Sequence, residues 1–339
     1  MKEAHPELGD VFAARRRLGR RLVRRTPLVP AEELSAAAGF EIYLKLECWQ
    51  TTGSFKVRGA ANKLLSLGGE ERRRGVIAFS TGNHGRAVAW LGRRLGLPAV
   101  ICLSARVPAW RIEALRALGA EVVVQGGGQD EAYARALEIQ KDRGLVMAAP
   151  FDDPLVIAGQ GTVALEILED LPEAAQVVVP LSGGGLFAGV ALAAKAIRPS
   201  IRAVGVSMAV APAMIRSLEA GRPVEIPEVD SLADALLGGV GLDNRHTFEL
   251  TRRYADQVEL VSEEEIAAGM FHAFDKLRLV VEGSGAVGLA AVLAGRIKGP
   301  GPVVLLVSGG NAAPETLAAI AAARYGPQGQ AAFKHMRRD

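Results

Sequence analysis

The sequence contains little that would suit a secreted or membrane-bound protein. Only two cysteines are present, Cys48 and Cys102, which excludes a disulfide framework and a four-cysteine zinc site and favours a reducing compartment. No run approaches the roughly 18 apolar residues that a membrane-spanning helix needs, and the N-terminal residues are charged where a signal peptide would be apolar. These absences together predict a cytoplasmic protein that does not enter a membrane.

An excess of charge of one sign is also missing. The chain has 40 lysine and arginine residues against 37 aspartate and glutamate residues, so its formal net charge is only +3 and gives no field that would attract nucleic acid. A small molecule is the expected partner. Seven arginines fall between Arg15 and Arg25 and could hold a phosphate, but the apolar residues near them recur at helical spacing. An amphipathic helix with a solvated basic face is therefore favoured by Val11, Phe12, Leu18 and Leu22.

What the chain does have is 49% hydrophobic residues, enough in 339 residues to form two domains. Short runs rich in Val, Ile and Leu alternate with helical patterns that end at glycine. Apolar strands separated by helices are typical of parallel sheets covered on both faces. The sequence therefore predicts an α/β fold with two open, doubly wound domains, which bind ligands at the carboxyl ends of their strands. The expected strands are 41–47, 75–81, 99–104, 120–126, 144–150, 176–182, 202–208, 257–262 and 302–310.

Four short segments carry groups suited to a small-molecule site. Segment 53–60 places Lys56 in a turn just before a helical pattern. Segments 79–90 and 180–189 each pass from a strand through a glycine-rich turn into a helix, where backbone N–H groups can bind an anion. The second of these turns has three consecutive glycines, which let the main chain approach a phosphate. Segment 307–313 ends a buried strand with a serine hydroxyl.

The triple-glycine turn by itself has other interpretations. It approximates the dinucleotide fingerprint, but its glycines are spaced G-x-G-x-x-x-G and the next strand, ending in VGVSMAVAP, has no acidic residue for a ribose. An NAD-dependent oxidoreductase is therefore disfavoured. The sequence has no Walker phosphate loop, and five scattered histidines with two cysteines show no transition-metal spacing. No metal site is expected.

Together, the four segments supply what a pyridoxal phosphate site requires: a reactive lysine, a phosphate cradle, an anion-binding turn with an asparagine, and a hydroxyl for the pyridine nitrogen. The sequence resembles the fold-type II pyridoxal-phosphate enzymes, the tryptophan synthase β-like family, and within them the serine/threonine dehydratase and serine racemase branch. The motifs that carry the resemblance are RRTPLVPAEELS, GSFKVRGA, STGNHGRAVA, PLSGGGLFAG, VEGSGAVGLAA and LLVSGGN. The segment LADALLGGVGLDNRHTFEL (232–250) is most similar to dehydratases of hydroxyectoine utilisation.

The resemblance implies a role for each matching residue. Lys56 is the implied Schiff-base lysine and catalytic acid/base, and Thr81 stands where the racemase has a serine as second acid/base. The implied cofactor contacts are Phe55 beside the ring, Lys56, Asn83 at the ring oxygen, the backbone of Gly183, Gly184, Gly185 and Leu186 at the phosphate, Glu282, and Ser308 at the pyridine nitrogen. The implied substrate-binding turn is Ser80, Thr81, Gly82, Asn83 and His84.

The chain also departs from the pattern that it resembles. Ser207 and Ala213 stand where the racemase and some dehydratases have the acidic residues of a divalent-cation site, so no metal is expected there. Thr81 retains a hydroxyl but is bulkier than serine, and Ala149 precedes PFDD where dehydratases often have histidine. The crowding at Thr81 makes elimination a better expectation than racemisation.

The activity implied by the resemblance is that of a pyridoxal-phosphate-dependent ammonia-lyase. Such an enzyme removes water from a 3-hydroxy amino acid, of threonine or serine type or derived from hydroxyectoine, and yields a 2-oxo acid and ammonia. A β-replacement synthase or an amino-acid racemase of the same fold remains an alternative, and an NAD-dependent oxidoreductase is a weaker one. The segments GGVGLDNRH and PFDD are expected to line the pocket, where Arg245 or Asp243 would discriminate acidic or cationic substrates.

The expected domain division is discontinuous. A larger, cofactor-binding domain would comprise residues 1–48 and 152–320, and a smaller, mobile domain, residues 49–151, would close over the substrate. Residues 321–339 are expected to form a frayed C-terminal tail. The family resemblance, rather than composition, implies a homodimer.

Overall fold

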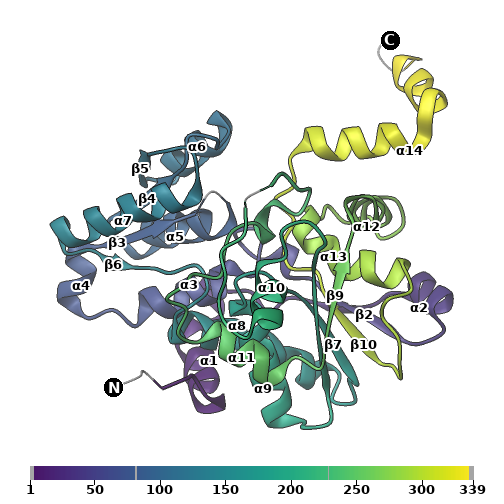
Figure 1. Ribbon diagram of the computed structural model, residues 1–339, viewed down its shortest axis with the longest axis horizontal. Helices are drawn as coiled ribbons and strands as arrows, with labels where there is room; N and C mark the ends of the chain where they lie inside the picture. Colours follow the sequence, from purple (N-terminus) through teal and green to yellow (C-terminus); the bar gives the residue numbers. More distant parts are fainter. Residues whose placement is uncertain (1–3, 81, 228, 336–339) are drawn as a thin grey trace.

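Two β-sheets organise the protein (Figure 1). The computed structural model describes residues 4–80, 82–227 and 229–335. Within them the larger sheet has the strand order β1, β2, β10, β7, β8, β9 and the smaller sheet has the order β5, β4, β3, β6. The predicted runs account for each of these strands except β1. The strands are β1 (Leu28–Pro30), β2 (Ile42–Lys45), β3 (Val76–Phe79), β4 (Ala99–Leu103), β5 (Glu121–Val124), β6 (Val146–Met147), β7 (Gln176–Pro180), β8 (Arg202–Met208), β9 (Gln257–Val261) and β10 (Val303–Leu306).

The strands run parallel, as predicted, with one exception. Neighbouring strands in both sheets are parallel apart from β1 and β2, which pair antiparallel with Leu28 opposite Lys45. Sequence reasoning missed β1 because it has three residues and ends at Pro30, which an edge strand tolerates. The expected strand 144–150 is also shorter than predicted, since β6 covers only Val146–Met147.

Helices cover both faces of both sheets (Figure 1). Most of them begin directly after a strand, which is the doubly wound arrangement that the alternating pattern predicts. The helices are α1 (Leu8–Leu22), α2 (Glu32–Ala38), α3 (Lys56–Leu65), α4 (Gly69–Arg74), α5 (Asn83–Leu95), α6 (Ala109–Ala117), α7 (Gln129–Arg143), α8 (Pro154–Asp170), α9 (Gly185–Ile197), α10 (Ala213–Ala220), α11 (Thr247–Tyr254), α12 (Glu263–Asp275), α13 (Gly283–Leu293) and α14 (Pro314–His335), with two short 3-10 helices, η1 (Glu47–Trp49) and η2 (Asp234–Leu236).

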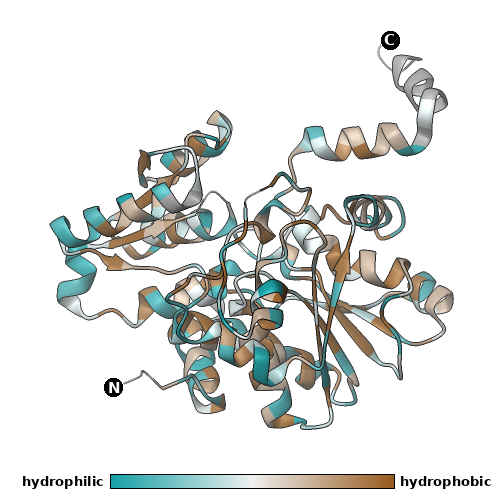
Figure 2. Cartoon of the chain, in the orientation of Figure 1, coloured by the Kyte–Doolittle hydropathy of each residue, from teal (hydrophilic) through white to brown (hydrophobic). Residues whose placement is uncertain are grey.

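The central strands of the larger sheet are apolar throughout because both of their faces are buried. Successive side chains of a strand point to opposite faces. In β7, Val177 and Val179 therefore pack in the core formed with α8 and α9, whereas Val178 packs in the core formed with α12 and α13. Figure 2 shows the resulting brown strands between helices that are teal on their outer sides. This explains why the sequence has continuous apolar runs here rather than an alternating pattern.

The smaller sheet is built in the same way. Ala78 and Ile101 pack in a core with α3 and α5, while Ile77 and Val100 face the opposite side, where α7 covers the sheet. Helix α3 thus belongs to the packing of the smaller sheet, although it also lies against α8 of the larger one. Its position between the two sheets matters for the site, because α3 begins at Lys56.

The arginine-rich N-terminal segment is the amphipathic helix α1, as predicted. Its residues Val11, Ala14 and Leu18 are buried, while Arg15 and Arg25 form ion pairs at the surface with Glu169 or Asp170 of α8. These arginines are at least two-fifths exposed, so their pairing contributes little to stability. The segment is therefore a surface helix that packs against α8 and α3.

The expected frayed tail covers residues 321–339, of which residues 336–339 lie outside the described part of the chain. Helix α14 continues through a bend at Gly326 as far as His335. Its alanine residues favour a helical backbone. Helix α14 extends away from the body of the protein in Figure 1. No helix in the part of the chain that the structure describes has the length and apolar character needed to cross a bilayer.

Candidate active site

One cavity of about 790 Å³ lies where strand ends and helix N-termini from both sheets converge. The segments that follow β3, β7 and β10 reach it, as do the first residues of α3, α5 and α9. Thr81 lies outside the described residues. The other residues that the sequence singles out all line this cavity: Phe55, Lys56, Ser80, Gly82, Asn83, His84, Gly183, Gly184, Gly185, Leu186, Glu282 and Ser308.

The Lys56 amine lies inside the cavity. The Nζ atom donates a hydrogen bond to the carbonyl oxygen of Pro150 at 2.8 Å and lies 5.2 Å from the centre of the Phe55 ring. Burial of the amine lowers the pKa of Lys56 to about 8, although the carboxylate of Glu282 acts in the opposite direction. An amine with this pKa has a substantial neutral fraction near neutral pH, and a neutral amine is the nucleophile that an aldehyde requires.

The triple-glycine turn forms the N-terminus of α9. This helix begins at Gly185, and its first turn has backbone N–H groups without partners inside the helix. Gly184 is the N-cap residue and has the left-handed backbone angle φ of +87°. A Cβ atom at that position would lie 2.8 Å from the Met214 Cε atom and 2.9 Å from the Thr247 Cβ atom. The turn therefore needs glycine, and the helix end offers N–H groups and a positive dipole to a phosphate.

Asn83 is the first residue of α5 and is held by hydrogen bonds at both ends of its carboxamide. Its Nδ2 atom donates to Glu282 Oε1 at 2.6 Å, and its Oδ1 atom accepts from Asn311 Nδ2 at 2.6 Å. Burial and the nearby Asp234 raise the pKa of Glu282 to about 7, while the hydrogen bond from Asn83 lowers it. Glu282 therefore contacts Asn83 directly, which sequence reasoning did not foresee.

The His84 side chain is hydrogen-bonded to the main chain. Its Nε2 atom lies 2.7 Å from the carbonyl oxygen of Ala148. Burial and the nearby Lys56 ammonium lower the pKa of His84 to about 3, so the imidazole is neutral and donates this hydrogen bond. The side chain thus fixes the segment that includes Pro150, the acceptor of the Lys56 amine. For a substrate carboxylate, the first turn of α5 still offers backbone N–H groups.

The two aspartates of PFDD organise the rim of the cavity, which they line as predicted. Asp152 accepts hydrogen bonds from three successive backbone N–H groups at the start of α11, at 2.6–2.9 Å, and so holds the GGVGLDNRH loop in place. Asp153 caps α8 through the backbone N–H groups of Leu155 and Val156 and pairs with Lys63 at 2.6 Å. Arg245 and Asp243 also line the cavity.

A second ion pair spans the mouth of the cavity. Arg111 of α6 pairs with Asp234 of η2 at 2.9 Å, and its guanidinium lies 5.2 Å from the centre of the Trp110 ring. Arg111 and Asp234 both line the cavity. The pair joins a helix over the smaller sheet to a segment of the larger half, so it links the two sides of the site.

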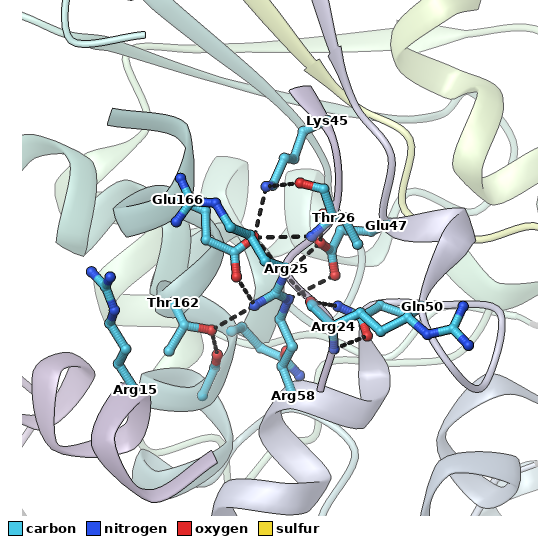
Figure 3. Close-up of polar contacts among 12 residues, drawn as sticks. Arg15, Arg24, Arg25, Thr26, Lys45, Glu47, Gln50, Arg58, Thr162 and Glu166 are labelled. Atoms are coloured by element: carbon cyan, nitrogen blue, oxygen red, sulfur yellow. Dashed lines mark hydrogen bonds and ion pairs between the residues drawn. The ribbon is translucent and has the colours of Figure 1, made fainter. Parts of the chain in front are cut away.

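Beneath the site, a buried ionic cluster fixes α3 (Figure 3). We define it as Arg58, Glu47, Glu166 and Lys45. Arg58 donates to both oxygens of Glu47 at 2.7 and 2.8 Å and to both oxygens of Glu166 at 2.7 and 2.9 Å. Lys45 donates to Glu166 at 2.7 Å. Although burial raises the pKa of Glu166, the neighbouring Arg58 and Lys45 charges lower it overall, so the carboxylate stays ionised. Because Arg58 lies two residues after Lys56, the cluster anchors the start of α3.

Sequence reasoning missed Asn311, the Pro150 carbonyl and the ionic cluster. Asn311 falls within the segment 307–313, where only the serine was assigned a role, so its position in that segment was the available signal. The partners of Arg58 are 11 and 108 residues away in the chain, and no local pattern indicates them.

The groups in the cavity fit pyridoxal phosphate. The Lys56 amine suits its aldehyde, the N-terminus of α9 its phosphate, and Asn83 its ring oxygen. Ser308 is buried at the end of β10, with its Oγ atom 3.5 Å from the Ser284 carbonyl oxygen, and its hydroxyl suits the pyridine nitrogen. The chemistry of this donor set therefore matches the cofactor part by part.

Comparison with known proteins decides the family. The family model described as "Pyridoxal-phosphate dependent enzyme" matches residues 20–309. The chain belongs to this family. It is 46% identical over 305 residues to an L-threonine ammonia-lyase of Thermotoga maritima, covering 90% of this chain and 75% of that protein. Pyridoxal-phosphate-dependent chemistry is thus supported over the NAD-dependent alternative.

Solved structures of the pyridoxal-phosphate family share the fold. Maize serine racemase matches with a TM-score of 0.89 and 33% identity, over 98% of this chain and 99% of that one. A threonine deaminase from T.th. matches with a TM-score of 0.83 and 38% identity, over 91% of this chain and 99% of that one. The α/β fold with doubly wound, parallel sheets is therefore the fold-type II architecture that the sequence predicts.

Replacing Gly184 tests the phosphate cradle. We expect Gly184→Ala to weaken cofactor affinity at least about tenfold, because the left-handed backbone costs about 1–2 kcal/mol for alanine and the new methyl group displaces Met214 and Thr247. Titration of pyridoxal phosphate into apoenzyme, followed by fluorescence, measures the change. Gly221→Ala is the matched control, because Gly221 has φ of +69° but an added Cβ meets nothing within 4 Å. Equal effects of the two variants would contradict the prediction.

Proposed function

We propose that the protein is an ammonia-lyase that removes water from threonine, and less efficiently from serine, to yield a 2-oxo acid and ammonia. The observation that carries the proposal is the Lys56 amine, held in the same cavity as the N-terminus of α9 with a pKa of about 8. A family relative with 46% identity is named for the threonine reaction, which supports this choice of substrate.

The residues of the cavity can carry the elimination. Bound pyridoxal phosphate draws electrons from the α-carbon of the amino acid and so makes its proton acidic. The N-terminus of α5 holds the substrate carboxylate, and the Lys56 amine takes the α-proton. The electron pair of that C–H bond forms a carbon–carbon double bond while the bond from the β-carbon to the hydroxyl breaks, and the hydroxyl departs as water with the proton that the Lys56 amine has taken. Hydrolysis of the unsaturated amine then consumes one water and gives the 2-oxo acid and ammonia.

Ser308 supports elimination over transamination. A carboxylate beside the pyridine nitrogen would keep that nitrogen protonated, whereas a serine hydroxyl does not carry the charge needed to do so. A neutral pyridine is a weaker electron sink and favours rapid loss of the β-hydroxyl. Ser308 is 3% exposed, so water does not take over this contact.

Two alternatives share the cavity and the cofactor. A β-replacement synthase would retain the unsaturated product for a second nucleophile, and an added thiol would then give a new amino acid in place of the 2-oxo acid. An amino-acid racemase would convert L-serine to D-serine without releasing ammonia. Maize serine racemase shares the fold at 33% identity, so this alternative has a structural basis, but the higher identity to the ammonia-lyase favours elimination.

A substrate panel tests the proposed function. Purified protein with pyridoxal phosphate is incubated with threonine, serine, 3-hydroxyaspartate and a hydroxyectoine-derived diamino acid, and the 2-oxo acid and ammonia are measured together. We expect equal amounts of the two products and the highest kcat/KM for threonine. Release of neither product from any of the four would reject the ammonia-lyase, and a preference for the diamino acid would assign the hydroxyectoine-related role.

We also propose that the cavity opens by movement of the smaller sheet and its helices. The predicted mobile domain is residues 49–151. Its helix α3 packs in the core of the smaller sheet and is also held to the larger half by the buried ionic cluster. The contacts that link the halves across the cavity include the Arg111–Asp234 ion pair and the hydrogen bonds from Asn83 to Glu282 and from Asn311 to Asn83. Opening would break these contacts, and closure would restore them and exclude water from the site.

The remaining proposals concern assembly and location. A homodimer is proposed from the family resemblance, and sedimentation of the purified protein would test it. A cytoplasmic location is proposed because Cys48 and Cys102 are both free and buried, which suits a reducing compartment.

A further inference from the structure

Asn311 lies among three different segments around the cavity and makes hydrogen bonds to two of them. It lies in the loop that follows β10 and lines the cavity itself. Its Nδ2 atom donates to Asn83 Oδ1 at 2.6 Å and to the carbonyl oxygen of Thr52 at 3.0 Å. Its backbone N–H lies near enough to the carboxylate of Glu282 to lower the pKa of that group. One residue thus contacts the turn before Lys56, the start of α5 and the cap of α13.

These contacts leave Asn83 with one orientation. A carboxamide has an oxygen that accepts and a nitrogen that donates two hydrogens. In the observed orientation the Asn83 oxygen faces the Asn311 donor and its nitrogen faces the Glu282 carboxylate. A flip by 180° would place two N–H groups against each other and two oxygens against each other, and both contacts would become repulsive. The second hydrogen on Asn83 Nδ2 remains as a donor for a ligand.

The turn before Lys56 is shaped around the same side chain. Gly53 has φ of +79°, and a Cβ atom there would collide with Asn311 Oδ1. Two backbone hydrogen bonds join this turn to the segment that follows β10. Gly310 N donates to Gly53 O at 2.9 Å, and Phe55 N donates to Ser308 O at 3.0 Å. These main-chain hydrogen bonds therefore hold the loop that carries Asn311 against the turn before Lys56.

We propose that Asn311 is a positioning residue that orients the Asn83 carboxamide toward the ring oxygen of the cofactor and ties that orientation to the turn carrying Lys56. This rests on the proposed contact between Asn83 and the cofactor. Asn311 acts through Asn83, so its loss changes how tightly the cofactor is held and the electronic environment of its ring. A donor at the ring oxygen affects the colour of the bound cofactor, which gives a readout independent of turnover.

The test is a double-mutant cycle on the holoenzyme. Asn311→Asp keeps the size of the side chain but removes both hydrogens that it donates and places a carboxylate against the Asn83 oxygen. We expect it to weaken pyridoxal phosphate affinity about tenfold, as for loss of one or two hydrogen bonds, and to shift the visible absorption maximum of the bound cofactor. In the Asn83→Ala background the same substitution should change affinity less than twofold. Asn311→Ser, which removes the same contacts without adding charge, is measured in both backgrounds as well and replaces Asn311→Asp if that variant does not fold.

Gln176→Glu is the matched control. Gln176 is also a buried amide, with its Nε2 atom 2.9 Å from the Lys298 carbonyl oxygen, but it lies outside the cavity. The Gln176→Glu substitution should leave the affinity for pyridoxal phosphate and the absorption maximum of the bound cofactor unchanged. The proposal is overturned if neither Asn311 variant changes affinity by more than twofold, or if the effects of Asn83→Ala and the Asn311 variants multiply. Since these readouts need only bound cofactor, a protein that binds pyridoxal phosphate but releases no ammonia would reject the ammonia-lyase and leave this inference standing.

Discussion

Replacing Lys56 by alanine should lower the rate of 2-oxo acid formation by roughly 10³-fold or more, since a positioned acid/base alone contributes about 10²–10⁴. The variant should also lose the visible absorption band that pyridoxal phosphate shows when it is bonded to a lysine. Both losses would have one cause, because we propose that the Lys56 Nζ atom, which lies in the cavity, both attaches the cofactor and takes the α-proton. Stopped-flow or coupled assays of the 2-oxo acid measure the first loss, and an absorption spectrum the second.

The controls for Lys56 separate a lost amine from a disturbed fold. Lys56→Arg keeps a cation at the position but cannot form the bond to an aldehyde, so it should fail as alanine does. Lys141→Ala removes an exposed lysine of α7 outside the cavity and should leave rate and spectrum unchanged. A Lys56→Ala protein that retains either the band or more than a tenth of the rate would refute the assignment.

The lowered pKa of Lys56 also predicts how the rate of cofactor attachment depends on pH. Its lowered pKa means that the amine is protonated below about pH 8 and neutral above it. The rate at which apoenzyme attaches pyridoxal phosphate should therefore rise with pH and level off near pH 8, whereas a free lysine side chain would continue to gain reactivity up to about pH 10.4. A rate that still rises steeply above pH 9 would show that the amine is not held in the cavity.

Replacing Arg58 by methionine should reduce the free energy of unfolding by about 3–5 kcal/mol. The substitution leaves the buried carboxylates of Glu47 and Glu166 with Lys45 as the remaining cation of the cluster, and an uncompensated buried charge is costly. Methionine keeps the apolar stem of arginine and removes the guanidinium, so the effect comes mainly from the lost charge and its hydrogen bonds. Urea unfolding followed by tryptophan fluorescence measures the change.

A surface ion pair supplies the comparison for Arg58. Arg135 pairs with Glu138 on α7 at 2.7 Å, with side chains 42% and 63% exposed. Arg135→Met should change stability by less than about 1 kcal/mol, since water screens such a pair. If Arg58→Met costs no more than Arg135→Met, the buried cluster does not anchor α3. A large loss would also be expected to raise the KM for substrate, because Lys56 begins the helix that the cluster holds.

The sequence predicted those parts of the site that depend on local chemistry. Lys56 in its turn and the three glycines at the start of α9 are recognisable because their spacing reflects what the backbone must do at those positions. Ser308 was found because it ends a continuous apolar strand. Asn311, three residues further on, was not found, because its function depends on Asn83 and Glu282, which are distant in the chain. The edge strand β1 was missed for a different reason, since three residues that end in proline give almost no pattern.

By itself, the sequence determined the α/β class, the doubly wound arrangement, the end of the sheets at which the cavity lies, and the residue types available there. Those features follow from periodicity and from glycine, which act within a few residues. Only the tertiary structure decided that the Lys56 amine has a lowered pKa, that the His84 imidazole is neutral and turned toward Ala148, and that Asn83 has a single orientation. The physical reason is that desolvation and hydrogen-bond direction depend on what the fold places on every side of a group, and most of those neighbours come from distant parts of the chain.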